Sequence, residues 1–447
     1  MGQNHGGIGF PQSGGMKPSI PPVNIPPPQA ARPPLDPSWR IGRLLWAPHR
    51  LGFFAAACVM LLAAIWWAVE MAWRVVPLAP LHHASVATYS HGLIMSLGFL
   101  PLFFVGFLFT AGPRWLGMPD QSAVPLLKPV LACVLGWFAL LVGTHVSQWL
   151  AAVGTGFSAA GWSVLVWRFV QIVRGSRAVD RLHAKLIAFA CTVGAALMWL
   201  AAAAVALDQM DALRLYAYLG LWWFVVPVYT TVAHRMIPFF TAAAVPVLDN
   251  WRPYWLLWSL MAFTWWHGTW VVLDDTGYLQ ASAWTVLRAS VSGAAALLVL
   301  ALAIRWGLVQ SLKIRLLAML HIGFVWLGLA YGLEAASLWM RSADQFGLGL
   351  APLHALSMGF LGSILLAMAT RVSCGHSGRT LTADDLAWGL YGVLQLAVVA
   401  RLVAALVPTY AQTGVVAAAL LWLVATGGWA LRYGRWFGRP RVDGKPG

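Results

Sequence analysis

The chain has 447 residues, of which 60% are hydrophobic and 10% are charged, and its mean hydropathy is +0.72. A soluble domain could not keep this much apolar surface from water, so the composition excludes a soluble globular protein. The net charge of +15 does not indicate a nucleic-acid partner, because the basic residues lie in short segments between apolar runs.

Residues 1–38 are rich in glycine and proline and contain too little apolar material to pack. We predict that they form a disordered cytoplasmic tail. They also lack the apolar core of a secretory signal, so we expect the first membrane helix to direct insertion. The expected membrane domain covers residues 39–436, and a short basic cytoplasmic tail, 437–447, follows it.

About twelve apolar runs follow the tail, each near or above the length that crosses about 30 Å of hydrocarbon. They cover residues 51–75, 90–112, 126–147, 151–172, 184–206, 213–233, 254–273, 284–304, 315–338, 351–371, 386–407 and 413–433. Only helices and closed barrels satisfy their backbone in lipid, and runs this long exclude the short alternating strands of a barrel. We therefore predict an all-α, polytopic integral membrane protein with about twelve transmembrane helices.

The basic residues are distributed unevenly between the two sides of this topology. If both termini are cytoplasmic, most of the 29 Lys and Arg residues fall in inner segments. The outer ends of the helices then carry only Arg74, Arg214, Arg288 and Arg341. Because cytoplasmic loops are enriched in Lys and Arg, we expect both termini to be cytoplasmic.

The same topology sorts the histidines into two levels. The outer level contains His82, His83, His91, His145, His267 and His354. The inner level contains His49, His183, His234, His321 and His376. For His82, His83 or His145 taken alone, an interfacial or hydrogen-bonding role is the simpler interpretation.

Three ionisable residues join the outer level within the apolar runs, namely Glu70, Glu334 and Arg401. Charged groups within a span are costly and usually face the bundle interior, where a partner or a substrate offsets the cost. Arg401 therefore needs an anion. A neighbouring glutamate or the propionates of a haem would supply it, since the guanidinium fork suits a carboxylate.

His91 and His354 are the clearest candidate cofactor ligands. Each opens a predicted helix from the outer face, and each precedes a small residue, Gly92 or Ala355, that would let a flat macrocycle approach the backbone. Two imidazoles on facing helices can fill both axial positions of a low-spin haem iron. We therefore predict a haem bound by His91 and His354, with Arg401 at its propionates.

These stretches resemble a known fold. HGLIM, followed by GFLPLFFVGFLF, is similar to helix 2 of the large subunit of haem-copper oxidases, and HALSMGFLG is similar to helix 10. The resemblance implies a haem-copper-oxidase-like bundle in which both histidines bind a low-spin haem. The similarity stops at the oxygen-reducing centre. Only the single His267 stands where the oxidases carry adjacent copper-binding histidines, and Pro352 replaces their second haem ligand.

A closer resemblance, covering residues from about 40 to 433, is to the NnrS family of bacterial membrane proteins. It is carried by GFLFTAGPRWLGMP (106–119), HRMIPFFTA (234–242) and MATRVSCGHSGRTL (368–381). The resemblance implies haem and copper in a bacterial inner-membrane protein. Our own expectation, from their predicted depth, is that His145 and His267 line or complete the copper position. The resemblance also implies a role in nitric oxide metabolism, nitrosative stress or denitrification. Nitric oxide, lipid and an electron donor are the expected partners, and an oxidoreductase activity stays open.

Two of these motifs fall on the cytoplasmic side of the predicted topology. They contain His234, Arg235, Arg371, His376 and Arg379. A turn rich in glycine, serine and arginine offers backbone N–H groups and guanidinium forks to an anion. A positive-inside loop shaped by its glycines is the simpler alternative.

Three further interpretations stay open at this point. A second metal site at His234, His321 and His376 would suit copper, but no spacing in the sequence shows that these residues converge. A transporter or channel for a metal ion or small anion would use the outer histidines and the basic inner loop as the two ends of a pathway. A haem protein that only transfers electrons would leave nitric oxide unreacted.

Overall fold

The computed structural model describes residues 1–2, 36–77, 79–276 and 282–444. The chain divides into Met1–Leu35 and Asp36–Gly447, and the second part is described here. Almost all of the predicted tail, residues 1–38, therefore lies outside the described residues. So do residues 445–447 of the predicted basic tail.

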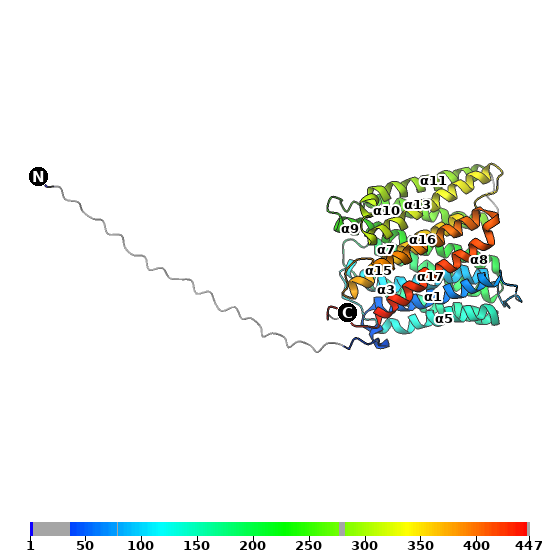
Figure 1. The fold of residues 1–447 in the computed structure, drawn as a ribbon, viewed down its shortest axis with the longest axis horizontal. Coiled ribbons are helices and arrows are strands. Elements are labelled where there is room, and N and C mark those ends of the chain that lie inside the picture. Colours follow the sequence, from blue (N-terminus) through cyan, green and yellow to red (C-terminus); the bar gives the residue numbers. More distant parts are fainter. Residues whose placement is uncertain (3–35, 78, 277–281, 445–447) are drawn as a thin grey trace. The chain divides into compact units, whose positions relative to one another are not determined.

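The second part is helical, and no strand occurs among its described residues. Its α-helices are α1 (Pro48–Trp73), α2 (Ala87–Leu93), α3 (Phe99–Leu108), α4 (Ala111–Trp115), α5 (Leu127–Val146), α6 (Gln148–Gly175), α7 (Leu182–Ala206), α8 (Met210–Leu219), α9 (Val226–Ala244), α10 (Tyr254–Thr276), α11 (Ser282–Arg305), α12 (Leu308–Ser311), α13 (Arg315–Ser342), α14 (Ala351–His354), α15 (Ser363–His376), α16 (Asp385–Leu406) and α17 (Ala411–Phe437). Short 3₁₀ turns are η1 (Ile41–Trp46), η3 (Val124–Leu126) and η6 (Pro408–Tyr410). The helices run side by side in a bundle (Figure 1), which confirms the all-α prediction.

Eleven helical segments of the described chain are long and apolar enough to cross a membrane. The predicted span 254–273 corresponds to α10, which is not one of the eleven. It is 23 residues long, but its tryptophans, threonines and His267 lower its hydropathy. The protein is therefore a multi-pass membrane protein whose crossings are set by apolar length.

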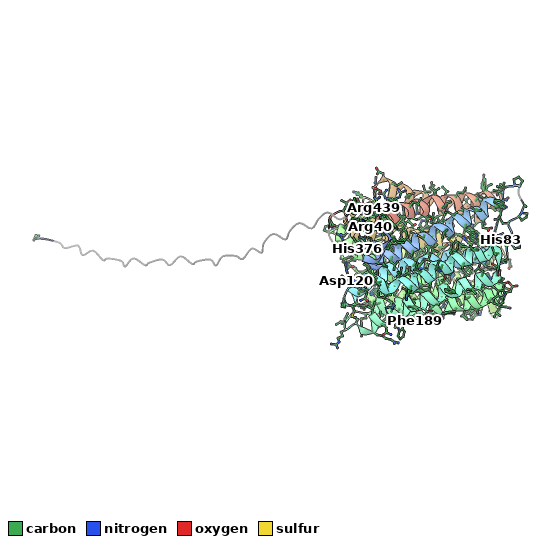
Figure 2. All side chains as sticks on the ribbon, turned by 90° about the horizontal axis from the view of Figure 1, so that it is seen from below. Arg40, His83, Asp120, Phe189, His376 and Arg439 are labelled. Atoms are coloured by element: carbon green, nitrogen blue, oxygen red, sulfur yellow. The ribbon has the colours of Figure 1, made fainter. Side chains whose placement is uncertain are left out.

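The two ends of the membrane part meet at one face of the bundle. The backbone N–H of Arg40 donates to the carbonyl of Gly438 at 2.9 Å. The Arg50 guanidinium donates to the carbonyls of Phe437 and Arg439 at 3.0 and 2.7 Å. Ends on the same face agree with an even number of crossings, as in the predicted topology, where the run that corresponds to α10 is one of twelve spans. Figure 2 shows His83 at the opposite end of the bundle from Arg40 and Arg439. The side of the membrane that each face contacts stays a prediction.

Small residues let neighbouring helices approach closely. In the α5–α6 pair, a Cβ added to Gly154 would lie 2.6 Å from the carbonyl oxygen of Gly136. A Cβ added to Gly136 would lie 2.4 Å from the carbonyl oxygen of Gly154. Because lipid offers no hydrophobic drive for helix association, such backbone approach supplies van der Waals contact that holds membrane helices together.

Three of the long membrane helices widen into a π-helical turn. These turns are η2 (Ile94–Gly98) between α2 and α3, η4 (Gly220–Val225) between α8 and α9, and η5 (Ala355–Gly362) between α14 and α15. Proline explains two of them: Pro101 and Pro227 lack the N–H that would bond the carbonyl four residues earlier, inside η2 and η4. Single π turns in α-helices are frequent at functional sites.

Candidate functional site

A cavity of about 430 Å³ lies where the three π turns come together. Its wall includes Met95 of η2, Leu221 of η4 and Met358 of η5, with Trp422 of α17. Most of the wall is apolar. The volume of the cavity is within the range of roughly 300–1,000 Å³ that ligand and cofactor sites have. Three of the residues singled out by the sequence, His91, His354 and Arg401, border this one cavity.

His91 lies on α2, one turn before η2 widens the helix. Its imidazole stacks on the indole of Trp67 from α1, with ring centroids 3.7 Å apart and planes 18° apart. The Nδ1 atom of His91 is buried and has no hydrogen-bond partner among the described residues. His91 therefore lacks the hydrogen bond that would fix its ring from the Nδ1 side, and its stack on Trp67 is the contact that orients it.

His354 ends α14, immediately before η5. Its Nδ1 lies 2.9 Å from the carbonyl oxygen of Leu350. A carbonyl only accepts, so Nδ1 donates and the neutral ring keeps its lone pair on Nε2. A backbone bond of this kind fixes the tautomer and the orientation of a metal-binding imidazole.

Arg401 enters the cavity wall from α16. Its guanidinium forms no hydrogen bond or ion pair with any residue in the described ranges. Of the two glutamates that the sequence offered as partners, Glu70 bonds to His83 instead. A guanidinium stays charged and carries five donors, so one without a partner in a membrane span suits the anionic end of a ligand.

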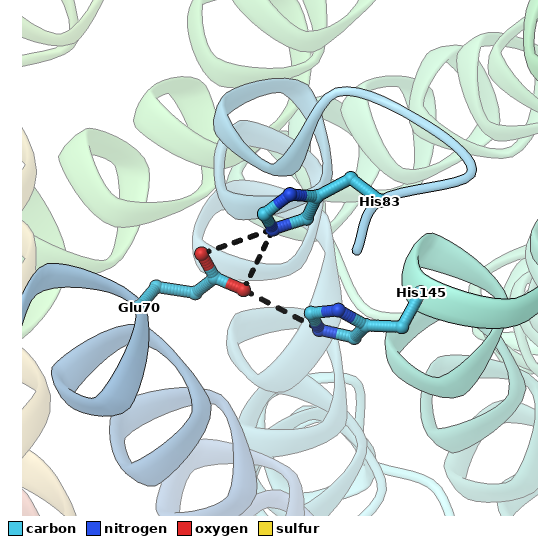
Figure 3. A group of neighbouring side chains, drawn as sticks. All are labelled: Glu70, His83 and His145. Atoms are coloured by element: carbon cyan, nitrogen blue, oxygen red, sulfur yellow. Dashed lines mark hydrogen bonds and ion pairs between the residues drawn. The ribbon is translucent and has the colours of Figure 1, made fainter. Parts of the chain in front are cut away.

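A second polar group lies outside this cavity, near the same end of the bundle. Glu70 from the last turn of α1 is 2% exposed. Its carboxylate oxygens lie 3.0 and 3.1 Å from Nε2 of His83, and one of them lies 3.4 Å from Nε2 of His145 (Figure 3). Among the described residues, this is the one group of three or more metal-binding side chains whose ligand atoms lie within 4.8 Å of one another. We call Glu70, His83 and His145 the outer triad.

The two predicted copper residues have different neighbours. His145 belongs to the outer triad, and its Nε2 also accepts a hydrogen bond from the indole N–H of Trp66 at 2.8 Å. His267 lies on α10 and packs against the indole of Trp222 from η4, with ring centroids 3.9 Å apart. The copper pairing of His145 with His267 stays a sequence prediction, and the contacts of the two residues do not add to it.

The arginines of the two motifs assigned to the cytoplasmic side each have their own aromatic contact. Arg235 pairs with Asp180 at 3.4 Å and lies over the ring of Trp115. Arg371 lies 3.9 Å from the ring centroid of Phe240. Arg379 lies 4.0 Å from the ring centroid of Trp436. Cation–π contacts of this kind hold the helix ends together and occupy the faces of the guanidinium groups.

The expected turn is largely helical, because α15 continues to His376. Ser373 and Gly375 therefore lie inside a helix, and the turn begins at Ser377. Gly378 has a φ of +72° there, the left-handed region that favours glycine. The segment thus offers fewer free N–H groups to an anion than the sequence suggested.

Four of the five inner-level histidines form two pairs, and the fifth, His321, bonds elsewhere, so they do not form a single cluster. Nδ1 of His234 lies 3.0 Å from Nε2 of His183. The ring of His376 lies 4.2 Å from that of His49, between centroids. His321 bonds to the Thr241 hydroxyl at 2.9 Å. The geometry therefore does not support a three-histidine site at His234, His321 and His376.

Sequence reasoning did not assign His83 to a site. It lies in the segment between α1 and α2, where no periodicity shows which way a side chain points. The sequence nevertheless contained a clue, because a charged Glu70 inside a membrane span is energetically costly. A carboxylate in a span needs a partner at its own depth, and His82 and His83 follow Glu70 at the outer level, as Arg74 does.

The comparisons with known proteins identify the family. A family model described as NnrS protein matches residues 43–441. No curated protein matches the chain. Since the match spans nearly the whole membrane part, including the cavity and the outer triad, the chain belongs to the NnrS family.

Proposed function

We propose that this chain is a haem-binding membrane protein of the nitric oxide response, with the haem in the cavity between His91 and His354. One observation carries the proposal: a single apolar cavity is bordered by two imidazoles from different helices and by a guanidinium that has no partner in the described chain. Family membership supports the nitric oxide response. The membrane is expected to be the bacterial inner membrane.

The residues around the cavity fit a haem in three ways. The imidazoles of His91 and His354 would hold the haem iron. Arg401 provides the charged donor that a propionate needs at membrane depth. The apolar wall, with Met95 and Met358, excludes water from the macrocycle. A bound haem supplies an iron that changes redox state and binds nitric oxide.

The two imidazoles are held differently. His354 is fixed by its bond to the Leu350 carbonyl, whereas His91 relies on its stack against Trp67. If both imidazoles held the iron, nitric oxide would reach it only after one imidazole had moved away. His91, whose Nδ1 has no partner within the described residues, is the one we expect to move. Nitric oxide is apolar enough to concentrate in lipid, so a site within the bundle is well placed to meet it.

The test is the haem content of purified variants. His91→Ala and His354→Ala should each lose most of the haem, measured as the pyridine haemochrome per mole of protein. His321→Gln is the matched control, because it keeps a hydrogen-bonding group beside Thr241 and does not border the cavity. Full haem in both alanine variants would contradict the assignment. A transporter, the alternative from sequence, would contain no haem in any of these proteins.

A further inference from the structure

We propose that the outer triad, Glu70, His83 and His145, binds one divalent transition-metal ion. The triad lies outside the cavity, so this inference does not rest on the haem assignment. Its ligand set is two imidazoles and one carboxylate from three separate segments: the end of α1, the α1–α2 connection and the end of α5. The remaining coordination positions are left for water or a small molecule.

The spacing of the three ligand groups fits a metal ion. Ligands bound at about 2.1 Å lie roughly 3.0 Å apart at a right angle and roughly 3.4 Å apart at the tetrahedral angle. The Glu70 oxygens lie 3.0 and 3.1 Å from His83 Nε2, and one of them lies 3.4 Å from His145 Nε2. Figure 3 shows both rings facing this carboxylate.

The hydrogen bonds of His145 fix its tautomer. Its Nδ1 lies 3.0 Å from the carbonyl oxygen of His82, so Nδ1 is the donor. In the neutral ring, Nε2 then carries a lone pair, as its bond from the Trp66 indole N–H requires. This lone pair and the Glu70 carboxylate are both acceptors, and they lie 3.4 Å apart. The Trp66 N–H occupies this lone pair in the structure, so a bound cation would take the lone pair over from the indole and bond the carboxylate as well.

The triad is held in place before any ion binds. The His82 ring donates to the carbonyl of His145 at 2.7 Å, and the backbone N–H groups of Ala84 and Ser85 donate to the carbonyl of Thr144 at 2.8 and 3.2 Å. These bonds fasten the α1–α2 connection to the end of α5 on both sides of His83. A ligating histidine that donates its other ring nitrogen to a carbonyl is the usual outer-shell arrangement of metal sites.

The chemistry of the donors selects the class of metal. Calcium and magnesium prefer oxygen ligands, whereas imidazole suits copper, zinc and iron. The competing interpretation is a metal-free ion pair between Glu70 and a protonated His83. That pair would account for Glu70 and His83. In that case the Trp66 N–H satisfies the His145 lone pair, so metal titration decides between the two interpretations.

Two contacts connect the triad to the cavity. Trp66 donates to His145, and its neighbour Trp67 stacks on His91. The hydroxyls of Ser90 and Thr144 lie 2.7 Å apart, and these residues precede His91 and His145 in the chain. A metal ion in the triad would therefore lie next to the segment that carries His91.

The experiment uses the full-length protein in detergent, stripped with chelator and titrated with Cu²⁺. We expect about one tightly bound ion per chain, with an electron paramagnetic resonance spectrum that shows coupling to two imidazole nitrogens. Glu70→Gln, His83→Asn and His145→Asn should each weaken binding by more than about 100-fold, beyond the 10–100-fold cost of losing an outer-shell partner. Size-exclusion profiles report whether each variant stays folded.

His267→Asn separates this site from the copper position suggested by sequence. It should keep the affinity and the spectrum of the unmodified protein. If His267→Asn abolished binding and the three triad variants did not, the ion would lie at α10 and the triad assignment would be wrong. Absence of imidazole coupling in the unmodified protein would overturn it as well, without any variant having to fold. Zn²⁺ competing for the Cu²⁺ site would support a general transition-metal site.

Discussion

The imidazole of His91 lies flat on the indole of Trp67, with ring centroids 3.7 Å apart. Trp67 also has the Arg74 guanidinium over its ring, 5.7 Å from the centroid. The plane of His91 is thus set by α1, although the residue belongs to α2. A ligand whose ring plane is fixed by a neighbouring helix needs that helix in place before it can bind a cofactor.

Trp67→Leu tests this contact. An aromatic pair contributes about 0.5–1.5 kcal/mol beyond its buried area, so the variant should retain haem about 2- to 10-fold more weakly than the unmodified protein. Trp67→Phe keeps a ring against His91, so its haem affinity should lie between that of Trp67→Leu and that of the unmodified protein. The measurement is haem loss to excess apomyoglobin. Equal rates in all three proteins would show that the stack has no part in holding the ligand.

Arg401→Leu removes from the cavity wall a guanidinium that has no partner among the residues the structure describes. A hydrogen bond to a charged group contributes about 1.5–3 kcal/mol, so haem affinity should fall about 10- to 100-fold. The haem that remains should have a more negative midpoint potential, because a nearby positive charge favours the reduced form. Arg401→Lys keeps the charge and should restore the potential in part. A redox titration with unchanged potential and full occupancy in Arg401→Leu would contradict the propionate role.

His376→Ala and Arg379→Ala change residues that do not border the cavity. Their haem spectra should therefore match the spectrum of the unmodified protein. Protection of cells against nitric oxide should nevertheless fall, if the basic motif that contains them acts in the response. Loss of haem in these variants would place the cofactor at the other end of the bundle. Normal protection by both would reduce the motif to a structural role.

Gly154→Ala tests the close approach of α5 and α6. The new Cβ would meet the Gly136 carbonyl oxygen at 2.6 Å and the backbone nitrogen of Leu140 at 2.7 Å. Overpacking of this kind costs about 1–3 kcal/mol. Gly156→Ala is the matched control on the same helix, because its Cβ would meet only the Trp199 ring, at 3.9 Å. Thermal unfolding in detergent should show a lower midpoint for the first variant only.

The bundle was predictable because membrane crossing depends on apolar length. The expected run 184–206 corresponds to α7, Leu182–Ala206, and the run 386–407 corresponds to α16, Asp385–Leu406. The depth of each residue in the membrane was also predictable, because a helix advances by about 1.5 Å per residue. His91, His354 and Arg401 were therefore placed at one level from the sequence, and they border one cavity.

What the sequence could not provide is the direction in which each side chain points. The outer triad depends on how α1 packs against α5 and on the bonds that fasten residues 82–85 to Thr144. The π turns depend on a competition between prolines and helix bonding that apolar periodicity does not report. His145 and His267 have a similar predicted depth, but depth alone did not show that they pack against different helices.

The most direct test of the account is the absorption spectrum of the purified protein, oxidised and then reduced with dithionite, before and after addition of nitric oxide. A haem held by His91 and His354 should give a Soret band with sharp reduced α and β bands, and nitric oxide should shift them as His91 is displaced. The His91→Ala variant should lack these bands. A preparation of the intact protein without a Soret band would contradict the proposed haem site.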